Sequence, residues 1–166
     1  AEINATPDVV LANDNHADQI VISGSPAAVG SVLLSVKVKR AVPLKVSGAF
    51  HSPLMTDAAA DFNIVLDSVA FRDARVPVIS NVEPTPAADA ETLKTRLMQQ
   101  MIGPVRWREI CLTLQEMGID QVVEVGPGKV LTGLVKRTCP GMALVNKGKL
   151  AELSVEATGV PSPSYA

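Results

Sequence analysis

His51 is the side chain in this sequence best placed for acid–base chemistry. It comes directly before Ser52-Pro53, a pair that is typical of a helix N-cap followed by a proline in the first turn. The positive end of a helix disfavours a charged imidazolium, and a neutral imidazole is what a general base requires. The sequence therefore makes His51 a candidate general base, and the alternative is a structural histidine at a helix start.

No serine nucleophile in its usual surroundings accompanies His51. The G-x-S-x-G elbow that exposes a reactive serine is absent. Cys111 and Cys139 have neither a C-x-x-C partner nor nearby histidines, which predicts free thiols in a reducing compartment and no metal site. His16 lies in a polar turn, so we expect it to be exposed. The chemistry expected of this chain is therefore proton transfer at His51.

Residues 125–129, Val-Gly-Pro-Gly-Lys, form a glycine loop between a predicted strand and a predicted helix. Helix N-termini bind anions, so such a loop could hold a phosphate. Its spacing fits neither G-x-x-x-x-G-K-[ST] nor G-x-G-x-x-G with a following acidic residue. We interpret the loop as a tight structural turn, with nucleotide binding as the alternative.

Composition excludes two classes of partner. The net charge of −2 gives no basic footprint for nucleic acid, and an aromatic content of 3% leaves few rings on which bases could stack. No run of 18 apolar residues and no signal peptide is present, so we expect a cytoplasmic protein that does not cross a membrane.

The N-terminal segment, residues 1–46, predicts the element order β-β-α-β. This order matches the last four elements of a β-α-β-β-α-β ferredoxin-like unit, whose first β-α pair would precede Ala1. Pro43 favours an edge position for the last strand. The expected elements are strands over 8–13 and 19–24, a helix over 26–36 capped by Ser25, and a strand over 40–46.

Residues 47–147 predict alternating helices and strands, which favours an α/β layer structure with a mostly parallel sheet. Residues 148–166 are rich in proline and serine toward their end and predict a flexible tail. The expected elements are helices beginning near Ser52, Asp89, Val105 and Lys129, and strands over 76–81, 121–125 and 143–145.

Three motifs together resemble a known family, the malonyl-CoA:acyl-carrier-protein transacylases of bacterial fatty acid synthesis. Residues 46–55 resemble its histidine motif, residues 101–107 its N-P-V-x-W segment, and residues 123–134 its E-V-G-P-G-K-V-L-T-G-L segment. The resemblance covers about residues 8–140. It implies the C-terminal half of such a transacylase, made of the C-terminal part of an α/β-hydrolase-like large subdomain (residues 47–147) and the back half of a ferredoxin-like small subdomain (residues 1–46).

The resemblance also implies an activity. A serine on a missing upstream segment would take a malonyl group from malonyl-CoA and pass it to the phosphopantetheine thiol of acyl carrier protein. The implied partners are malonyl-CoA, acyl carrier protein and the missing N-terminal half, and no cofactor is implied beyond the coenzyme A thioester. This chain alone is expected to be inactive. The alternative is a non-catalytic carrier-protein-binding module or a truncated fragment.

Residue roles follow from the same resemblance. His51 would be the general base, and the backbone carbonyl of Gln100 would orient the other ring nitrogen in place of a carboxylate. Phe50 resembles the malonyl-selective form of the motif, in which a bulky ring narrows the acyl pocket. The remaining positions are Asn13 and Asn81 near the active-site cleft, and Lys39 and Arg40 facing the acidic carrier protein.

Overall fold

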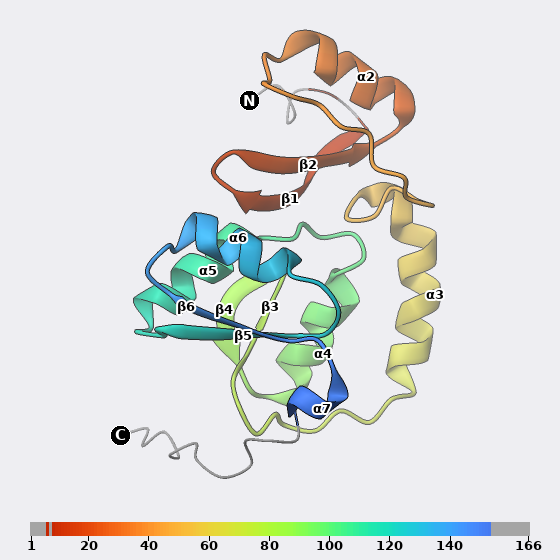
Figure 1. The fold of residues 1–166 in the computed structure, drawn as a ribbon. Helices are drawn as coiled ribbons and strands as arrows, with labels where there is room; N and C mark the ends of the chain where they lie inside the picture. The colour runs from red at the N-terminus through yellow and green to blue at the C-terminus, as the bar shows by residue number, and fades with distance from the viewer. Residues whose placement is uncertain (1–5, 7, 154–166) are drawn as a thin grey trace. The chain divides into compact units, whose positions relative to one another are not determined.

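The structure is a computed structural model that describes residue 6 and residues 8–153. The chain divides into two compact units, Ala1–Thr113 and Leu114–Ala166, each of which contains strands and helices (Figure 1). Helices and strands are both present throughout, which confirms the predicted α/β class. Within the described residues, none of the helices is long and apolar enough to cross a membrane.

The first unit begins with a β-hairpin and a helix, as the sequence predicts. β1 (Val9–His16) and β2 (Gln19–Gly24) pair antiparallel, and α2 (Pro26–Ser35) follows. The Ser25 hydroxyl accepts a hydrogen bond from the Ala28 N–H at 3.3 Å, which is the expected N-cap. The hairpin and the capped helix are confirmed.

His16, which the sequence led us to expect at the surface, is buried. It is the last residue of β1 and only 5% exposed. The expectation was wrong because β1 continues through residues 13–16, although their polar composition favours a turn. The following residues make the turn, and the Asp18 N–H donates to Nδ1 of His16 at 3.2 Å.

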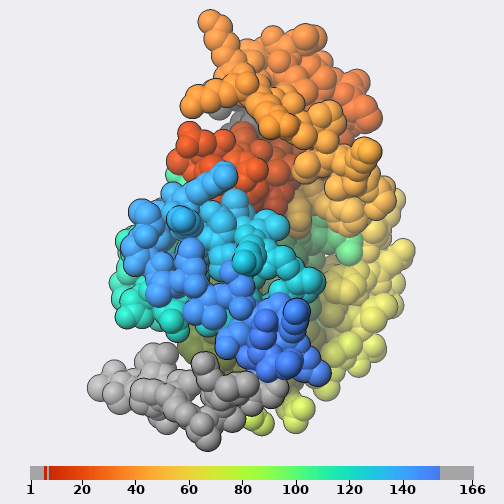
Figure 2. Space-filling model, viewed as in Figure 1, coloured from red at the N-terminus to blue at the C-terminus, as the bar shows by residue number. Residues whose placement is uncertain are grey.

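The strand predicted over 40–46 is absent, so the predicted β-β-α-β order is wrong in its last element. The segment is irregular, and its one local backbone bond joins the Val46 N–H to the Leu44 carbonyl at 3.1 Å. A strand requires a partner edge, and no described strand pairs with this segment. It runs over the surface (orange in Figure 2), where Leu44 and Val46 are 58% and 64% exposed.

The helix expected after His51 begins as a short 3₁₀ helix. Ser52 caps η1 (Pro53–Met55), which leads directly into α3 (Thr56–Asp67). The Ser52 side chain is 1% exposed and makes two hydrogen bonds. Its hydroxyl donates to the Ala49 carbonyl at 2.6 Å and accepts from the Leu54 N–H at 3.3 Å. Ser52 therefore fixes the chain on both sides of the turn that carries His51.

An antiparallel hairpin follows, where we had expected a parallel arrangement. β3 (Val78–Ser80) pairs with β4 (Glu83–Ala87), a strand that the sequence analysis missed. Pro84 and Pro86 hid it, because proline is scarce in strands. Every second N–H of an edge strand points away from its partner, so prolines in alternate positions are compatible with this pairing.

Two helices follow β4 along the chain. α4 (Ala90–Gln99) is capped by Asp89, whose carboxylate accepts from the Thr92 N–H at 2.8 Å, as predicted. Hydrogen bonds from the Thr92 side chain and then from its backbone hold the pKa of Asp89 below its ordinary value. α5 (Trp107–Glu116) begins after the Gly103-Pro104 break and buries Ile110 and Cys111.

The second unit contains a β-α-β element. β5 (Gln121–Val125) and β6 (Ala143–Lys147) pair in parallel, and α6 (Val130–Thr138) connects them and lies over the pair (Figure 1). The buried apolar side chains of the second unit are Val135, Cys139 and Met142. A short helix, α7 (Leu150–Leu153), lies within the range 148–166 that the sequence predicts to be a flexible tail. The rest of the predicted tail lies outside the described residues.

Candidate active site

His51 adopts an uncommon backbone conformation. Its φ of +62° lies in the left-handed region, which residues other than glycine rarely enter. The His51 N–H donates to the Met101 carbonyl at 3.0 Å, which ties the turn to the segment after α4. Strained backbone of this kind is concentrated at functional sites, where the surrounding structure holds it in place.

Two backbone carbonyls hold the imidazole ring of His51. Its Nδ1 lies 3.1 Å from the Gln100 oxygen and 3.0 Å from the Gly103 oxygen. Carbonyl oxygens only accept hydrogen bonds, so Nδ1 must carry the proton and donate it to both. In the neutral ring Nε2 is then unprotonated, and within the described residues it accepts no hydrogen bond. This is the protonation state that a general base requires.

The Gln100 side chain lies beside the same nitrogen. The amide nitrogen stands 3.4 Å from Nδ1 of His51. Because Nδ1 already donates, the oxygen end of the amide suits this position better than the nitrogen end, and the two ends are assigned from the surrounding hydrogen bonds. His51 and Gln100, which the resemblance had paired, thus meet in space although 49 residues separate them.

Residues 101–106 connect the histidine turn to β1, which contains Asn13, and to Asn81 in the turn between β3 and β4. The Val105 N–H donates to the Ala12 carbonyl at 2.7 Å, and Asn13 forms a parallel bridge with Val105. The Arg106 N–H donates to the Asn81 carbonyl at 2.9 Å. The structure therefore gathers Asn13, Asn81 and His51 around one segment, and both asparagines are attached to it through their backbone.

Arg106 forms a bidentate ion pair with Glu109. Nε and Nη2 of Arg106 lie 2.9 and 2.6 Å from the two Glu109 carboxylate oxygens. This hydrogen-bonded pair lowers the pKa of Glu109 and raises that of Arg106. Nη1 lies 3.7 Å from a Glu83 oxygen as well. Arg106 is therefore engaged in holding the segment together.

Comparison with known proteins decides the family. Residues 1–155 match the model of the acyl transferase domain. The chain belongs to this family. It is 54% identical over 147 residues to the malonyl CoA-acyl carrier protein transacylase of Synechocystis, a match that covers 89% of this chain and 50% of the relative. The relative of the same name from Bacillus subtilis is 46% identical over 132 residues, covering 78% and 42%.

Solved structures agree with this acyl transferase assignment. The malonyl-CoA:ACP transacylase of Synechocystis superposes with a TM-score of 0.87 at 53% identity, covering 92% of this chain and 52% of that one. The acyl carrier protein S-malonyltransferase of Vibrio cholerae gives 0.83 at 35% identity, covering 92% and 50%. The resemblance recognised in the sequence is thus confirmed, and the chain spans about half the length of the curated relatives that it matches.

The other predicted site residues of this acyl transferase chain lie in different surroundings. Phe50 is 43% exposed next to His51, and its Cε2 lies 3.7 Å from the point where a Cβ on Gly48 would stand. Lys39 and Arg40 are exposed on the irregular segment after α2. No hydrogen bond joins either of them to His51 in the part of the chain that the structure describes. Their roles stay predictions.

The glycine loop of the acyl transferase chain is a structural turn whose anion position is already occupied. The Glu124 carboxylate accepts from the Leu131 and Thr132 N–H groups at 3.1 and 2.8 Å, and from the Thr132 hydroxyl and the Asn146 amide at 2.9 and 3.0 Å. Hydrogen bonds from the Thr132 backbone, followed by the others, hold the pKa of Glu124 below its ordinary value. A phosphate at this end of α6 would meet a carboxylate, which argues against nucleotide binding.

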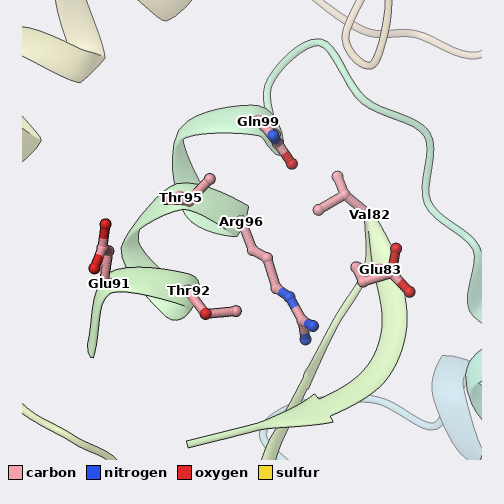
Figure 3. Close-up of a pocket in the computed structure, with 7 residues that line it drawn as sticks. All are labelled: Val82, Glu83, Glu91, Thr92, Thr95, Arg96 and Gln99. Carbon is pink, nitrogen blue, oxygen red and sulfur yellow. The ribbon is translucent and has the colours of Figure 1, made fainter. Parts of the chain in front are cut away.

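A separate cavity of about 350 Å³ lies between α4 and β4 (Figure 3). Arg96 extends across it and donates to the Thr85 carbonyl and hydroxyl at 2.6 and 2.9 Å. The ring of His51 does not line this cavity, which is therefore distinct from the candidate active site. Its lining residues are Val82, Glu83, Glu91, Thr92, Thr95, Arg96 and Gln99.

Sequence reasoning missed the contribution of two residues at the site. Gly103 enters the sequence analysis only within the 101–107 segment, although its carbonyl is the nearer of the two acceptors for the His51 ring. Ser52 had been interpreted only as a helix cap, although it also bonds back to Ala49 before the histidine. The Gly-Pro pair marked the turn, but nothing in the sequence marked its proximity to His51.

Proposed function

We propose that this chain supplies the general base of a malonyl-CoA:acyl-carrier-protein transacylase. The observation that carries the proposal is the state of the His51 ring, with its proton held on Nδ1 by two carbonyls and Nε2 open to accept another. A ring held in this way can take the proton of a serine hydroxyl as that oxygen attacks a thioester.

The proposed reaction proceeds in two matched steps. The serine oxygen attacks the malonyl carbonyl while Nε2 of His51 takes the hydroxyl proton, and the resulting imidazolium gives that proton to the departing coenzyme A sulfur. The phosphopantetheine thiol of the carrier protein then attacks the malonyl-serine by the same route in reverse. The Gln100 and Gly103 carbonyls favour the imidazolium through their partial negative charge, taking the place of a carboxylate.

The serine is proposed to lie on an upstream half, since this sequence has no G-x-S-x-G elbow. Exposed apolar side chains on α2 and α3 support such a partner: Leu34 is 91% exposed and Ile64 is 71% exposed. We propose that these surfaces pack against the upstream half. The ferredoxin-like and hydrolase-like subdomain assignments, with boundaries at residues 46 and 147, and a cytoplasmic location belong to the same proposal.

The remaining assignments concern substrate and partner. Phe50, partly exposed beside His51, is proposed to narrow the acyl pocket, with Asn13 and Asn81 near the cleft. Lys39 and Arg40 are exposed cations that suit an acidic carrier protein. One solved relative, 36% identical, is described as a malonyl-transacylase in complex with a type II polyketide acyl-carrier protein. No cofactor is proposed beyond the coenzyme A thioester.

Complementation tests the proposal. The chain is mixed with the N-terminal half of the Synechocystis relative, and malonyl transfer to a carrier protein is followed by mass spectrometry. We expect transfer by the pair, none by either half alone, and a loss of about 10²–10⁴-fold with His51→Ala. Gly141→Ala, in the second unit, where an added methyl meets no atom within 4 Å, is the control and should keep full activity. Equal transfer by the wild-type and His51→Ala pairs would refute the proposal.

A carrier-protein-binding module without catalysis is the second candidate, favoured by the absence of a serine elbow and the exposed Lys39 and Arg40. It predicts binding of acyl carrier protein by this chain alone, weakened in Lys39→Ala/Arg40→Ala, and no transfer by the complemented pair. Titration of a fluorescent carrier protein, combined with the transfer assay, separates the two candidates.

A further inference from the structure

The turn that faces His51 closes as tightly as it does because residue 103 has no side chain. A Cβ built on Gly103 would lie 2.8 Å from Cγ1 of Val82 and 2.9 Å from the Gln99 carbonyl oxygen. The Gly103 N–H also donates to the Gln99 carbonyl at 2.8 Å. One of the two close atoms belongs to the backbone and the other to a stiff β-branched side chain, so neither can yield easily. A methyl group at 103 must therefore displace the turn.

Displacement of this turn would reach His51 directly. The Gly103 carbonyl lies 3.0 Å from Nδ1, compared with 3.1 Å for the Gln100 carbonyl. The Met101 carbonyl, in the same turn, accepts the His51 backbone N–H at 3.0 Å. Both acceptors of the ring proton thus come from residues 100–103, and residue 103 provides one of them.

We propose that Gly103, packed against Val82, is a positioning residue that keeps the ring proton of His51 on Nδ1. With two acceptors at Nδ1, the neutral ring favours the tautomer whose Nε2 is bare. With the Gly103 oxygen moved away, only the Gln100 carbonyl remains to favour it. The effect of Gly103 on catalysis rests on the proposed function. Its effect on the His51 tautomer does not, because the tautomer can be measured in this chain without substrate and without the upstream half.

The chain contains its own reference for this measurement. It has two histidines, and the Asp18 N–H donates to Nδ1 of the buried His16 at 3.2 Å. A nitrogen that accepts a hydrogen bond carries no proton, so the neutral His16 ring must be protonated on Nε2. The two rings are therefore expected to be opposite tautomers, and the His16 signal reports whether the fold around it is intact.

Nitrogen-15 NMR of the full chain labelled at histidine tests the proposal, at a pH of about 9, where an ordinary histidine is neutral. Two-bond correlations distinguish the protonated nitrogen of each ring from the bare one. In the wild type we expect His51 protonated at Nδ1 and His16 at Nε2. His51 protonated mainly at Nε2 would overturn the proposal at once.

Gly103→Ala provides the perturbation. We expect the ratio of the Nδ1–H to the Nε2–H form of His51 to fall about fivefold, as loss of one hydrogen bond implies, with the His16 signal unchanged. The control is Gly30→Ala, also in the first unit but in open space, and it should leave both rings as they are. An unchanged His51 ratio in Gly103→Ala overturns the proposal. Loss of the His16 signature also overturns it, because the glycine would then serve the fold rather than the ring.

A second variant isolates the part played by Val82. Val82→Ala combined with Gly103→Ala removes the 2.8 Å approach and leaves the 2.9 Å approach to the Gln99 oxygen. The His51 tautomer ratio should then lie between those of the wild type and of Gly103→Ala. Val82 also lines the cavity between α4 and β4 (Figure 3). A double variant no closer to the wild type than the single one would show that Val82 does not support the turn.

Discussion

Ser52→Ala should destabilise the first unit because it removes two hydrogen bonds from a buried position. The hydroxyl caps η1 through the Leu54 N–H at 3.3 Å and donates to the Ala49 carbonyl at 2.6 Å. Loss of an N-cap costs about 1 kcal/mol, and loss of a further intramolecular hydrogen bond also costs about 1 kcal/mol. The side chain is 1% exposed, so water cannot easily replace it. We expect the free energy of unfolding to fall by about 2 kcal/mol.

Urea denaturation followed by circular dichroism measures this change. With a slope of about 1–3 kcal/mol per molar, the midpoint should fall by about 1 M. Ser68→Ala is the matched control, because its hydroxyl donates to the Val65 carbonyl at 2.7 Å with the same spacing but in an exposed position. That change should cost less than about 0.5 kcal/mol. Equal midpoints for the two variants would refute the argument that burial at residue 52 sets the cost.

Further predictions concern the second unit. The pKa of Glu124 is lowered on folding, so the stability that this carboxylate contributes is complete above the ordinary pKa of 4.5 and is lost as the pH falls below that value. As the pH is lowered through this range, the urea midpoint should therefore fall less in Glu124→Gln than in the wild type. Gly126→Ala and Gly128→Ala, at φ of +126° and +98°, should each lower stability by at least about 1 kcal/mol in urea titrations, whereas Gly133→Ala within α6 should raise it by about 0.5–1 kcal/mol. Millimolar nucleotide should leave the melting temperature unchanged, because Glu124 occupies the end of α6; a rise would contradict the structural role of the loop.

Local chemistry explains which elements the sequence predicted well. Ser25 and Asp89 were identified as helix caps because a cap depends on a side chain and the next three residues. The parallel pair β5–β6 was expected from an apolar run, a glycine turn and a helix within 30 residues. Such signals involve residues that are close together in the sequence, so they can be recognised without knowledge of the tertiary structure.

Pairing between distant segments explains the errors. The segment 40–46 has the alternation of a strand, but a strand also needs an edge to bond with, and the described strands provide none. β4 has two prolines and is still a strand because β3 lies beside it. The same limit applies to the site. His51 stood out by its context, but its contact with Gly103 depends on how α4 ends and on Val82 packing behind the turn.

The rate of the first chemical step tests the central claim most directly. A complemented pair at saturating malonyl-CoA is quenched at millisecond intervals, and malonyl-serine on the upstream half is measured by intact mass. If Nε2 of His51 takes the serine proton, His51→Ala should slow this single turnover by about 10²–10⁴-fold while malonyl-CoA still binds. A malonyl-serine burst of undiminished rate in His51→Ala would contradict the account.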